Sequence, residues 1–353
     1  MAKLTATVVG GGSGGRLSLT GLAASAEYTL KAVADLRPET GAELEKLYPG
    51  LRAFTSHEQM FRECPADVVC VSTWPPSHEA VTRAALQGPL KGILVEKPLG
   101  DTAAAGASIL AQVKARGIPM AVPHGLLVTR HTGEIFKRVQ GGEIGDVLLV
   151  EVQCRGWDIL NAGIHWVNFF VQLVKNEPVD WVLAQCDAST RTFRDGLQVE
   201  TMAVTYAQTK SGVRLVMNTG DYAVTTRAGK GTVFHILGTQ GSIEFWAWES
   251  AYRIVSPAFP TGKHIDVTPH PQTNHQMHLE NLARQIAAGT PDYAVAESSQ
   301  TALEICEAAF VSSRERCQVT LPLAGFKAPP QNDWRPGTPY SGSGGGRDGR
   351  KLR

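Results

Sequence analysis

The sequence lacks an excess of either charge: 34 lysine and arginine residues stand against 33 aspartate and glutamate residues, which gives a formal net charge of +1. Without a basic excess there is no electrostatic argument for binding nucleic acid or an anionic membrane. The sequence also lacks a run of about 18 apolar residues, the length that crosses a bilayer, and its N-terminus has no signal-peptide pattern. We therefore expect a cytoplasmic protein without nucleic-acid or membrane partners.

Cysteine is scarce. The chain of 353 residues has six cysteines and no C-x-x-C pair. In a chain of this size scattered cysteines indicate reduced thiols, and they argue against a disulfide framework or a zinc site. The six are Cys64, Cys70, Cys154, Cys186, Cys306 and Cys317.

The length and the 43% hydrophobic content are those of a globular protein too long for one ordinary core, so two domains are expected. In the first third of the chain, short apolar runs alternate with helical stretches, which is the pattern of βαβ units and a parallel sheet. Strands are predicted at 4–9, 28–34, 66–72, 92–95 and 118–122, and helices at 16–25, 40–48, 79–87 and 101–116.

After about residue 123 the pattern changes to longer alternating segments, which predict a large, mostly antiparallel open sheet. We expect strands at 147–154, 179–188, 199–209, 213–219, 232–237 and 242–245, and helices at 134–140, 161–175, 275–288 and 298–316. The predicted organisation is α/β: a Rossmann domain (1–122), a substrate-binding and oligomerisation domain (123–323) and a low-complexity, disordered tail (324–353).

Five of the six residues from Gly10 to Gly15 are glycine, directly after an apolar strand. Gly10, Gly12 and Gly15 fit the G-x-G-x-x-G pattern, in which glycines allow a tight turn, close approach of a pyrophosphate and close helix packing. The pattern alone is weak, but the flanking strand and helix and a later acidic residue support it. We predict a dinucleotide site that includes Gly10, Gly12, Ser13, Gly14 and Gly15.

Asp35 ends the second strand, where a carboxylate can hydrogen-bond the adenosine ribose. Because a carboxylate repels a 2′-phosphate, NAD is the predicted cofactor. Arg37 could pair with that phosphate, so NADP is kept as the alternative, and both residues are assigned to the cofactor site.

The segment Glu96-Lys97-Pro98 ends the predicted strand 92–95, at the edge of the sheet that faces the ligand crevice. A lysine there can hydrogen-bond a substrate oxygen and, if partly desolvated, exchange a proton. A surface lysine in a turn is the alternative interpretation.

With this segment the sequence resembles the Gfo/Idh/MocA family, named after glucose–fructose oxidoreductase, inositol dehydrogenase and a rhizopine-catabolism protein. The resemblance covers roughly residues 4–323. It rests on an ordered series of motifs: VVGGGSGG, DVVCVSTWPPSH, VEKPL, GGEIGDV, LNAGIHWVN, HILGTQGSIE, HLENLARQIAAGTP and VTLPL.

The resemblance implies a nicotinamide-dependent oxidoreductase acting on sugars, cyclitols or related polyols, with Lys97 at the reacting oxygen and His165 as general acid or base. It also implies a homodimer or homotetramer built on the open sheet. The family loop that lies along the cofactor corresponds to 73–78, so Thr73, Trp74, His78 and Glu96 join the predicted cofactor site.

The chain departs from the family at the aspartate four residues before the histidine, which here is Asn161, and Asn168 is a second amide where an acid is common. Asn161 can orient the substrate but supplies no negative charge. His124 fits a family substrate position, although the arginine that follows it is displaced to Arg130 or missing. The predicted substrate site also includes Arg155, Trp157 and Asp158.

Two other functions remain open at this point: internal redox with tightly held NAD, leading to glycoside cleavage, and a non-catalytic dinucleotide-binding regulator. No metal is predicted, because His270, His275 and His278 have no cysteine or carboxylate cluster to complete a ligand set, and they fit helix-face histidines better.

Overall fold

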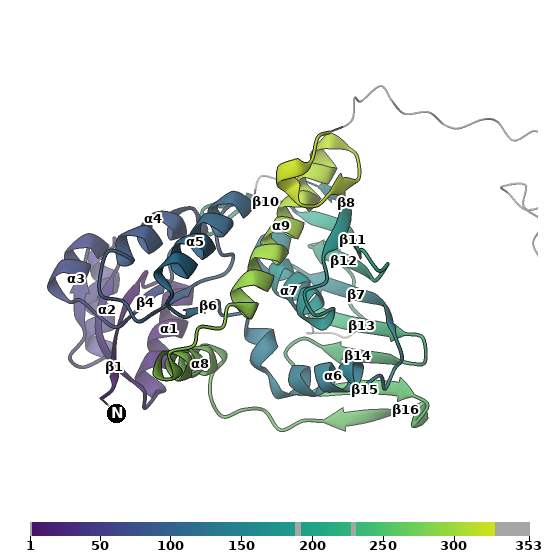
Figure 1. The fold of residues 1–353 in the computed structure, drawn as a ribbon, viewed down its shortest axis with the longest axis horizontal. Coiled ribbons are helices and arrows are strands. Elements are labelled where there is room, and N and C mark those ends of the chain that lie inside the picture. Colours follow the sequence, from purple (N-terminus) through teal and green to yellow (C-terminus); the bar gives the residue numbers. More distant parts are fainter. Residues whose placement is uncertain (1, 188–191, 227–230, 329–353) are drawn as a thin grey trace, which may run out of the picture.

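The computed structural model describes residues 2–187, 192–226 and 231–328. Two sheets dominate it, and Figure 1 shows a smaller α/β unit beside a large sheet, with a long helix running between them. The predicted α/β class, a parallel sheet followed by a mostly antiparallel one, is confirmed.

The first sheet is six-stranded and parallel throughout. In spatial order its strands are β3 (Arg52–Phe54), β2 (Tyr28–Ala34), β1 (Leu4–Val9), β4 (Val68–Val71), β5 (Gly92–Val95) and β6 (Met120–Ala121). Strands β4, β5 and β6 are short apolar runs buried throughout, as expected for a parallel sheet covered by helices on two sides. The order changes direction between β1 and β4, and ligands bind at such a switch point.

The helices of this unit are α1 (Ser13–Ala24), α2 (Pro38–Leu47), α3 (His57–Glu63), α4 (Pro75–Ala85) and α5 (Ala103–Arg116). Helices α1 and α4 begin earlier than predicted. Helix α1 starts within the glycine run, and α4 starts with two prolines, which are tolerated in a first turn because their missing N–H groups need no partner there. Strand β3 and helix α3 were not predicted, because both are very short.

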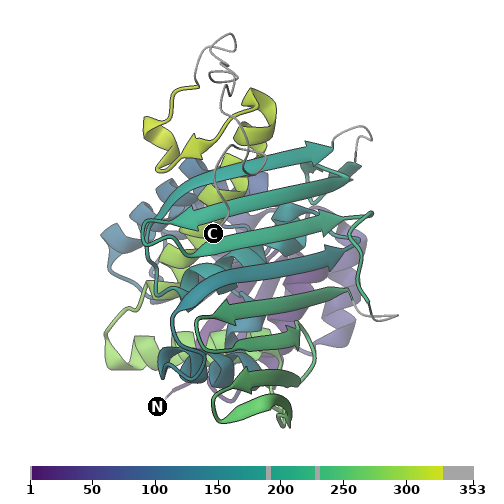
Figure 2. The same ribbon diagram turned by 90° about the vertical axis from the view of Figure 1, so that its right-hand side faces the viewer.

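The second sheet has nine strands, all antiparallel to their neighbours except for the parallel pair of β7 and β12. In spatial order they are β16 (Phe259–Asp266), β15 (Ala251–Ser256), β14 (Ser242–Trp246), β13 (Thr232–Gly238), β7 (Val147–Arg155), β12 (Arg214–Gly220), β11 (Met202–Thr209), β8 (Val179–Asp187) and β17 (Val319–Thr320). Figure 2 looks onto the open face of this sheet, with the helices behind it.

The covered face packs against helices α6 (Arg130–Gln140), α7 (Ile164–Leu173) and α9 (Ala294–Glu315). A π-helical turn, Ile159–Gly163, leads into α7, where the sequence predicted only regular helix. Strands β15 and β16 were not predicted. Neither was the small hairpin of β9 (Thr192–Arg194) and β10 (Leu197–Val199). Two short 3₁₀ turns, Gly125–Val128 and Leu323–Gly325, complete the described elements.

Helix α8 (Asn274–Ala288) returns from the second half of the chain to the first sheet. Leu279, Leu282 and Ala283 belong to the same apolar cluster as Leu19 and Leu22 of α1. The hydroxyl of Tyr28 donates a hydrogen bond to the carbonyl of Leu279 at 2.6 Å. The six-stranded unit is therefore completed by helix α8, which begins about 150 residues after residue 122, the predicted end of the first domain.

No helix within the described residues combines the length and apolarity needed to cross a bilayer. Of the predicted tail, 324–353, residues 329–353 lie outside the described residues.

Candidate active site

The glycine turn has the geometry that each glycine position requires. Gly10 has φ of +98°, and a Cβ there would overlap the carbonyl of Ser72 at the end of β4. A Cβ on Gly15 would overlap the carbonyl oxygen of Gly10, so α1 packs directly on the turn. At Gly12, by contrast, no heavy atom of the described chain lies within 4 Å of an added Cβ. The turn is thus tightly packed at Gly10 and Gly15 and open at Gly12, as a bound pyrophosphate requires.

Helix α1 presents its N-terminal N–H groups at this open side, because Gly12 is the N-cap and makes no side-chain capping bond. Ser13 is exposed as the first residue of the helix. Gly14 faces the carboxyl group of Glu96, which would lie 3.4 Å from an added Cβ. The residues present fit a dinucleotide, with the glycine turn and the α1 N-terminus at its phosphates.

Asp35 is held in place by backbone donors. Its Oδ2 accepts from the N–H of Gly11 at 2.7 Å, and its Oδ1 accepts from the N–H of Arg37 at 2.9 Å and from Arg37 Nε at 3.2 Å. Burial by itself would raise the pKa of Asp35, but these hydrogen bonds and the guanidinium charge outweigh it and lower the pKa. Position 35 is therefore an ionised acceptor, and Arg37 pairs with it.

The two turns that follow β4 and β5 are joined by His78. Its Nε2 lies 2.9 Å from the carbonyl of Thr73, and its Nδ1 lies 3.1 Å from the carbonyl of Pro98. Burial lowers the pKa of His78, so one N–H of a neutral ring donates to one of the two turns. The ring is fully buried between the two turns, and its hydrogen bond fixes the turn that receives it. A direct cofactor contact for His78 stays a prediction.

Glu96 is buried and pairs with His275 of α8, with 2.6 Å between Oε1 and Nε2. Burial acts to raise the pKa of Glu96, but His275 and nearby Lys97 lower it. The helix that completes the first domain therefore also fixes the residue next to Lys97.

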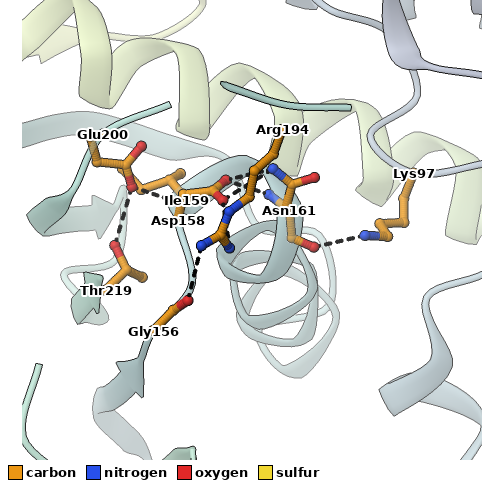
Figure 3. Close-up of polar contacts among 8 residues, drawn as sticks. All are labelled: Lys97, Gly156, Asp158, Ile159, Asn161, Arg194, Glu200 and Thr219. Carbon is orange, nitrogen blue, oxygen red and sulfur yellow. Dashed lines mark hydrogen bonds and ion pairs between the residues drawn. The ribbon is translucent and has the colours of Figure 1, made fainter. Parts of the chain in front are cut away.

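Lys97 reaches from the end of β5 to the π-helical turn (Figure 3). Its Nζ donates to the backbone carbonyl of Asn161 at 2.7 Å. Burial lowers the pKa of Lys97, and the carboxylates of Glu96, Asp195 and Asp158 partly offset this. A lysine with a lowered pKa, placed after the carboxyl end of β5 and against the π-helical turn, can exchange protons with a bound hydroxyl.

His165 lies on the first turn of α7 and stacks edge-on against His124, with 5.1 Å between the ring centroids. Its Nδ1 is buried and has no hydrogen-bond partner within the described part of the chain. Burial, and then the charge of Lys97, lowers the pKa of His165 well below its usual value. The ring is thus neutral at pH 7, beside the lysine.

His124 is itself fully buried, its Nε2 hydrogen-bonds Ser299 of α9 at 2.9 Å, and its ring packs against His165. His278 contacts the carbonyl of His124, and burial lowers the pKa of His278 to about 4. Asn168 donates to Ser298 at 3.1 Å, inside the helical layer. Contact of His124 with a substrate stays a prediction.

The π-helical turn is held at its start by two carboxylates (Figure 3). Asp158 accepts from the backbone N–H of Asn161 at 2.8 Å, and from its side-chain amide at 3.0 and 3.1 Å. Glu200 accepts from the N–H of Ile159 at 2.7 Å, and burial raises the pKa of Glu200 to about 7. Short π-helical segments are rare and occur frequently at functional sites.

Arg194, on the β9–β10 hairpin, points at the same turn. Its Nη1 lies 3.4 Å from Asp158 Oδ2, its Nη2 donates to the carbonyl of Gly156 at 3.3 Å, and its guanidinium lies 4.9 Å from the Trp157 ring centroid. Arg155 is exposed at the end of β7. The structure thus brings 155–161, Lys97 and the hairpin together.

Three exposed tryptophans lie around this site: Trp74, Trp157 and Trp248, with 65%, 51% and 56% of their surface exposed. Trp74 packs against Gly196 at the hairpin tip. Trp248 lies next to the histidine, with its ring centroid 6.3 Å from that of His165. Exposed indoles offer flat apolar faces of the kind that stack on rings.

Among the described residues, no group of three or more histidine, cysteine, aspartate or glutamate side chains is arranged to hold a metal ion. His275 and His278 lie on α8 with the contacts given above, and His270 accepts a hydrogen bond from Arg130 at 3.2 Å.

A family model described as "Oxidoreductase family, NAD-binding Rossmann fold" matches residues 4–124, the part of the chain that holds the glycine turn, Asp35 and Lys97. Residues 4–124 thus match the Gfo/Idh/MocA oxidoreductase family. The resemblance seen in the sequence is thereby confirmed.

Among curated proteins, inositol 2-dehydrogenase of Acidiphilium cryptum is 26% identical over 236 residues, which cover 64% of this chain and 66%, just under two thirds, of that protein. Among solved structures, levoglucosan dehydrogenase in complex with NADH and levoglucosan aligns with a TM-score of 0.77 at 17% identity, over 91% of this chain and all of that one. Aldose-aldose oxidoreductase from Caulobacter crescentus, complexed with glycerol, aligns with a TM-score of 0.77 at 20% identity, over the same shares. At these identities the two structures show the fold.

Sequence reasoning missed Arg194, Glu200, Trp248 and the pairing of His275 with Glu96. One signal was present: Asp195-Gly196 is a two-residue turn with φ of 49° and 79°, and Asp-Gly flanked by strand residues indicates a hairpin. Glu200, Trp248 and His275 lie far along the chain from the residues that they contact.

Proposed function

We propose that this protein is an NAD-dependent dehydrogenase that transfers a hydride between the nicotinamide and a hydroxyl-bearing carbon of a sugar, cyclitol or related polyol. One observation carries the proposal: the glycine turn adjoins the Lys97–His165 pair, since Gly14 borders Glu96 and Lys97 follows Glu96 directly. The names of the relatives, inositol 2-dehydrogenase, levoglucosan dehydrogenase and aldose-aldose oxidoreductase, support the substrate class.

NAD would be held by the glycine turn, the α1 N-terminus and Asp35, and when bound it supplies a nicotinamide that accepts or returns a hydride. Lys97 Nζ would exchange its contact with the Asn161 carbonyl for one with the substrate hydroxyl and take that proton as the carbon is oxidised. His165, neutral and unpartnered at Nδ1 within the described chain, would relay the proton or orient the hydroxyl.

Trp157 and Trp248 would cover the apolar C–H faces of the substrate ring, because both indoles are exposed, Trp248 beside His165 and Trp157 beside Arg194 at the π-helical turn. The cofactor would be NAD in preference to NADP, since the ionised Asp35 repels a 2′-phosphate and Arg37 is already paired with it.

The open face of the nine-stranded sheet would bind a second copy of the chain. It exposes Leu183 and Val204, beside the stacked rings of Trp181 and Tyr206, whose centroids lie 5.1 Å apart. An exposed apolar sheet face of this kind marks an interaction surface. Light scattering should then report a dimer or tetramer, and Val204→Glu should shift it toward monomer.

The test is a calorimetric titration with NAD and NADP, followed by a panel of inositols, aldoses and anhydrosugars assayed by NADH absorbance. We expect NAD to bind at least about tenfold more tightly than NADP and one polyol class to yield NADH. Tightly held NAD without net NADH would support internal redox instead. Binding without turnover would support a regulator, and no binding of either dinucleotide would refute the cofactor site.

A further inference from the structure

Asp158 is the most heavily engaged side chain at the π-helical turn, although it touches neither Lys97 nor His165 in the contacts described above. Only 2% of its surface is exposed. Its two oxygens accept from the backbone N–H and the side-chain amide of Asn161, and Oδ2 faces Arg194. A carboxylate buried this deeply is costly unless it is paired and hydrogen-bonded, so its partners here hold its charge in place.

The group that Asp158 fixes is the group that Lys97 contacts. Asn161 is anchored through both its N–H and its amide, and its backbone carbonyl accepts from Lys97 Nζ. Figure 3 shows this line of contacts, from Arg194 through Asp158 and Asn161 to Lys97. A displacement of Asp158 would therefore move the acceptor that holds the lysine.

The side chain at position 161 is an uncharged amide, so the negative charge of this turn is supplied by position 158. The groups around Lys97 are Glu96 from its own turn, Asp158 from the π-helical turn, Asp195 from the hairpin, and the neutral rings of His165 and His124. Three carboxylates thus favour the charged lysine, while burial favours the neutral one.

Arg194 counteracts one of these carboxylates. Its guanidinium is fixed by the carbonyl of Gly156 and by the Trp157 ring, and its hairpin rests against Trp74 and Pro76 of the first domain. The hairpin therefore holds a positive charge at Asp158 that weakens the attraction between Asp158 and Lys97.

We propose that Asp158 and Arg194 form a positioning pair, in which Asp158 fixes the acceptor of Lys97 and supplies the charge that position 161 lacks, while Arg194 tempers that charge. The pair sets what fraction of Lys97 is neutral and able to accept a proton. This deepens the proposed function, since it assigns residues that tune its proton-transferring lysine.

The test measures the reactivity of Lys97 without cofactor or substrate, by competitive labelling with acetic anhydride and mass spectrometry of the peptides. Only a neutral amine reacts, so the labelling rate at pH 7, divided by the plateau rate of the same lysine at high pH, reports the neutral fraction separately from the accessibility of the amine. In Asp158→Asn we expect the Lys97 rate to rise about threefold or more, because a carboxylate is lost, and in Arg194→Gln to fall by a similar factor. The rate of exposed Lys263 in the same sample should stay constant.

A charge relocation separates this effect from disturbed folding. In the double variant Asp158→Asn/Asn161→Asp the carboxylate moves to position 161, while the amide introduced at position 158 keeps a side-chain oxygen for the N-cap. The Lys97 rate should return to within about twofold of the wild type. Asp266→Asn is the matched control, because Asp266 is 89% exposed on the far strand β16, and it should change nothing.

Unchanged Lys97 labelling in folded Asp158→Asn, or an equal change in both single variants in the same direction, would overturn the proposal. If Asp158→Asn does not fold, the Arg194→Gln variant and the relocation variant still decide it. NAD binding and turnover are measured separately on the same proteins, so loss of the proposed function would be seen even where the labelling result stands.

Discussion

The glycine turn after β1 and the lysine–histidine cluster between the domains adjoin each other through Glu96 but are built from different atoms. At the turn, backbone N–H groups hold Asp35, and glycines leave a space open over α1. At the cluster, Glu96 and Lys97, which follow β5, lie with side chains of α7 and α8, and Nδ1 of both His124 and His165 has no partner in the described residues. The first region is arranged to receive a ligand, whereas in the second burial shifts the pKa of Lys97 and of the histidines below their values in water.

The largest effect should follow from removing the lysine of the cluster. We expect Lys97→Ala to lower kcat about 100- to 10,000-fold, the usual contribution of a general acid or base, while the Kd for NAD changes less than about twofold. The measurement is steady-state kinetics on the polyol found in the panel, together with calorimetry. Lys91→Ala is the control, since Lys91 is ion-paired with Asp67 and precedes β5, at the end of the strand opposite to Lys97. A large loss of NAD affinity in Lys97→Ala would show that the two regions are not separable.

Substituting two glycines of the turn should have different effects, one on stability and the other on NAD binding. A Cβ at Gly15 meets the backbone of Gly10, so Gly15→Ala should lower the free energy of unfolding by about 3 kcal/mol, measured by urea denaturation. A Cβ at Gly12 meets nothing in the described chain, so Gly12→Ala should keep wild-type stability yet weaken NAD binding at least about tenfold. Equal stability losses in both variants would contradict the open geometry at Gly12.

The cluster should make the protein sensitive to acid. His278 has a pKa of about 4 in the folded state and an ordinary value of 6.5, so the unfolded chain binds a proton that the folded protein does not. Stability should therefore fall as pH falls from 6.5 toward 4, by about 3 kcal/mol for this residue alone. The difference in unfolding free energy between His278→Gln and wild type isolates that share from other titrating groups, Glu200 among them. A pH-independent difference would mean that His278 is not buried as a neutral ring.

The smallest effect concerns the aromatic edge of the cluster. Trp248→Ala should raise KM about three- to tenfold with little change in kcat, because an exposed indole contributes stacking but no proton. Trp248→Phe should recover part of the loss. An effect on kcat alone would instead indicate that Trp248 acts by packing against His165.

The same contrast explains what could be predicted from the sequence. The turn, Asp35 and the strand before Lys97 are local patterns in which spacing dictates the backbone, and the structure forms them as expected. The pairing of Glu96 with His275 joins residues 179 positions apart. The hydrogen bond between Asp158 and Asn161 depends on the π-helical turn that Asp158 caps. Helical periodicity gave no sign of that turn. For Arg194, the Asp-Gly turn predicts a hairpin, but the sequence does not indicate the direction in which that hairpin points.

The return of α8 to the first sheet also bears on how the chain is made. During synthesis the strands and helices of residues 4–121 leave the ribosome first, but Leu279, Leu282 and Ala283, which complete their apolar cluster, follow only after the whole second sheet except β17 has been translated. Until then Leu19 and Leu22 on α1 lack the helix that covers them. A nascent chain halted before residue 274 would thus expose an apolar surface that chaperones can bind. A recombinant fragment ending at residue 122 would expose the same surface, because it also lacks α8.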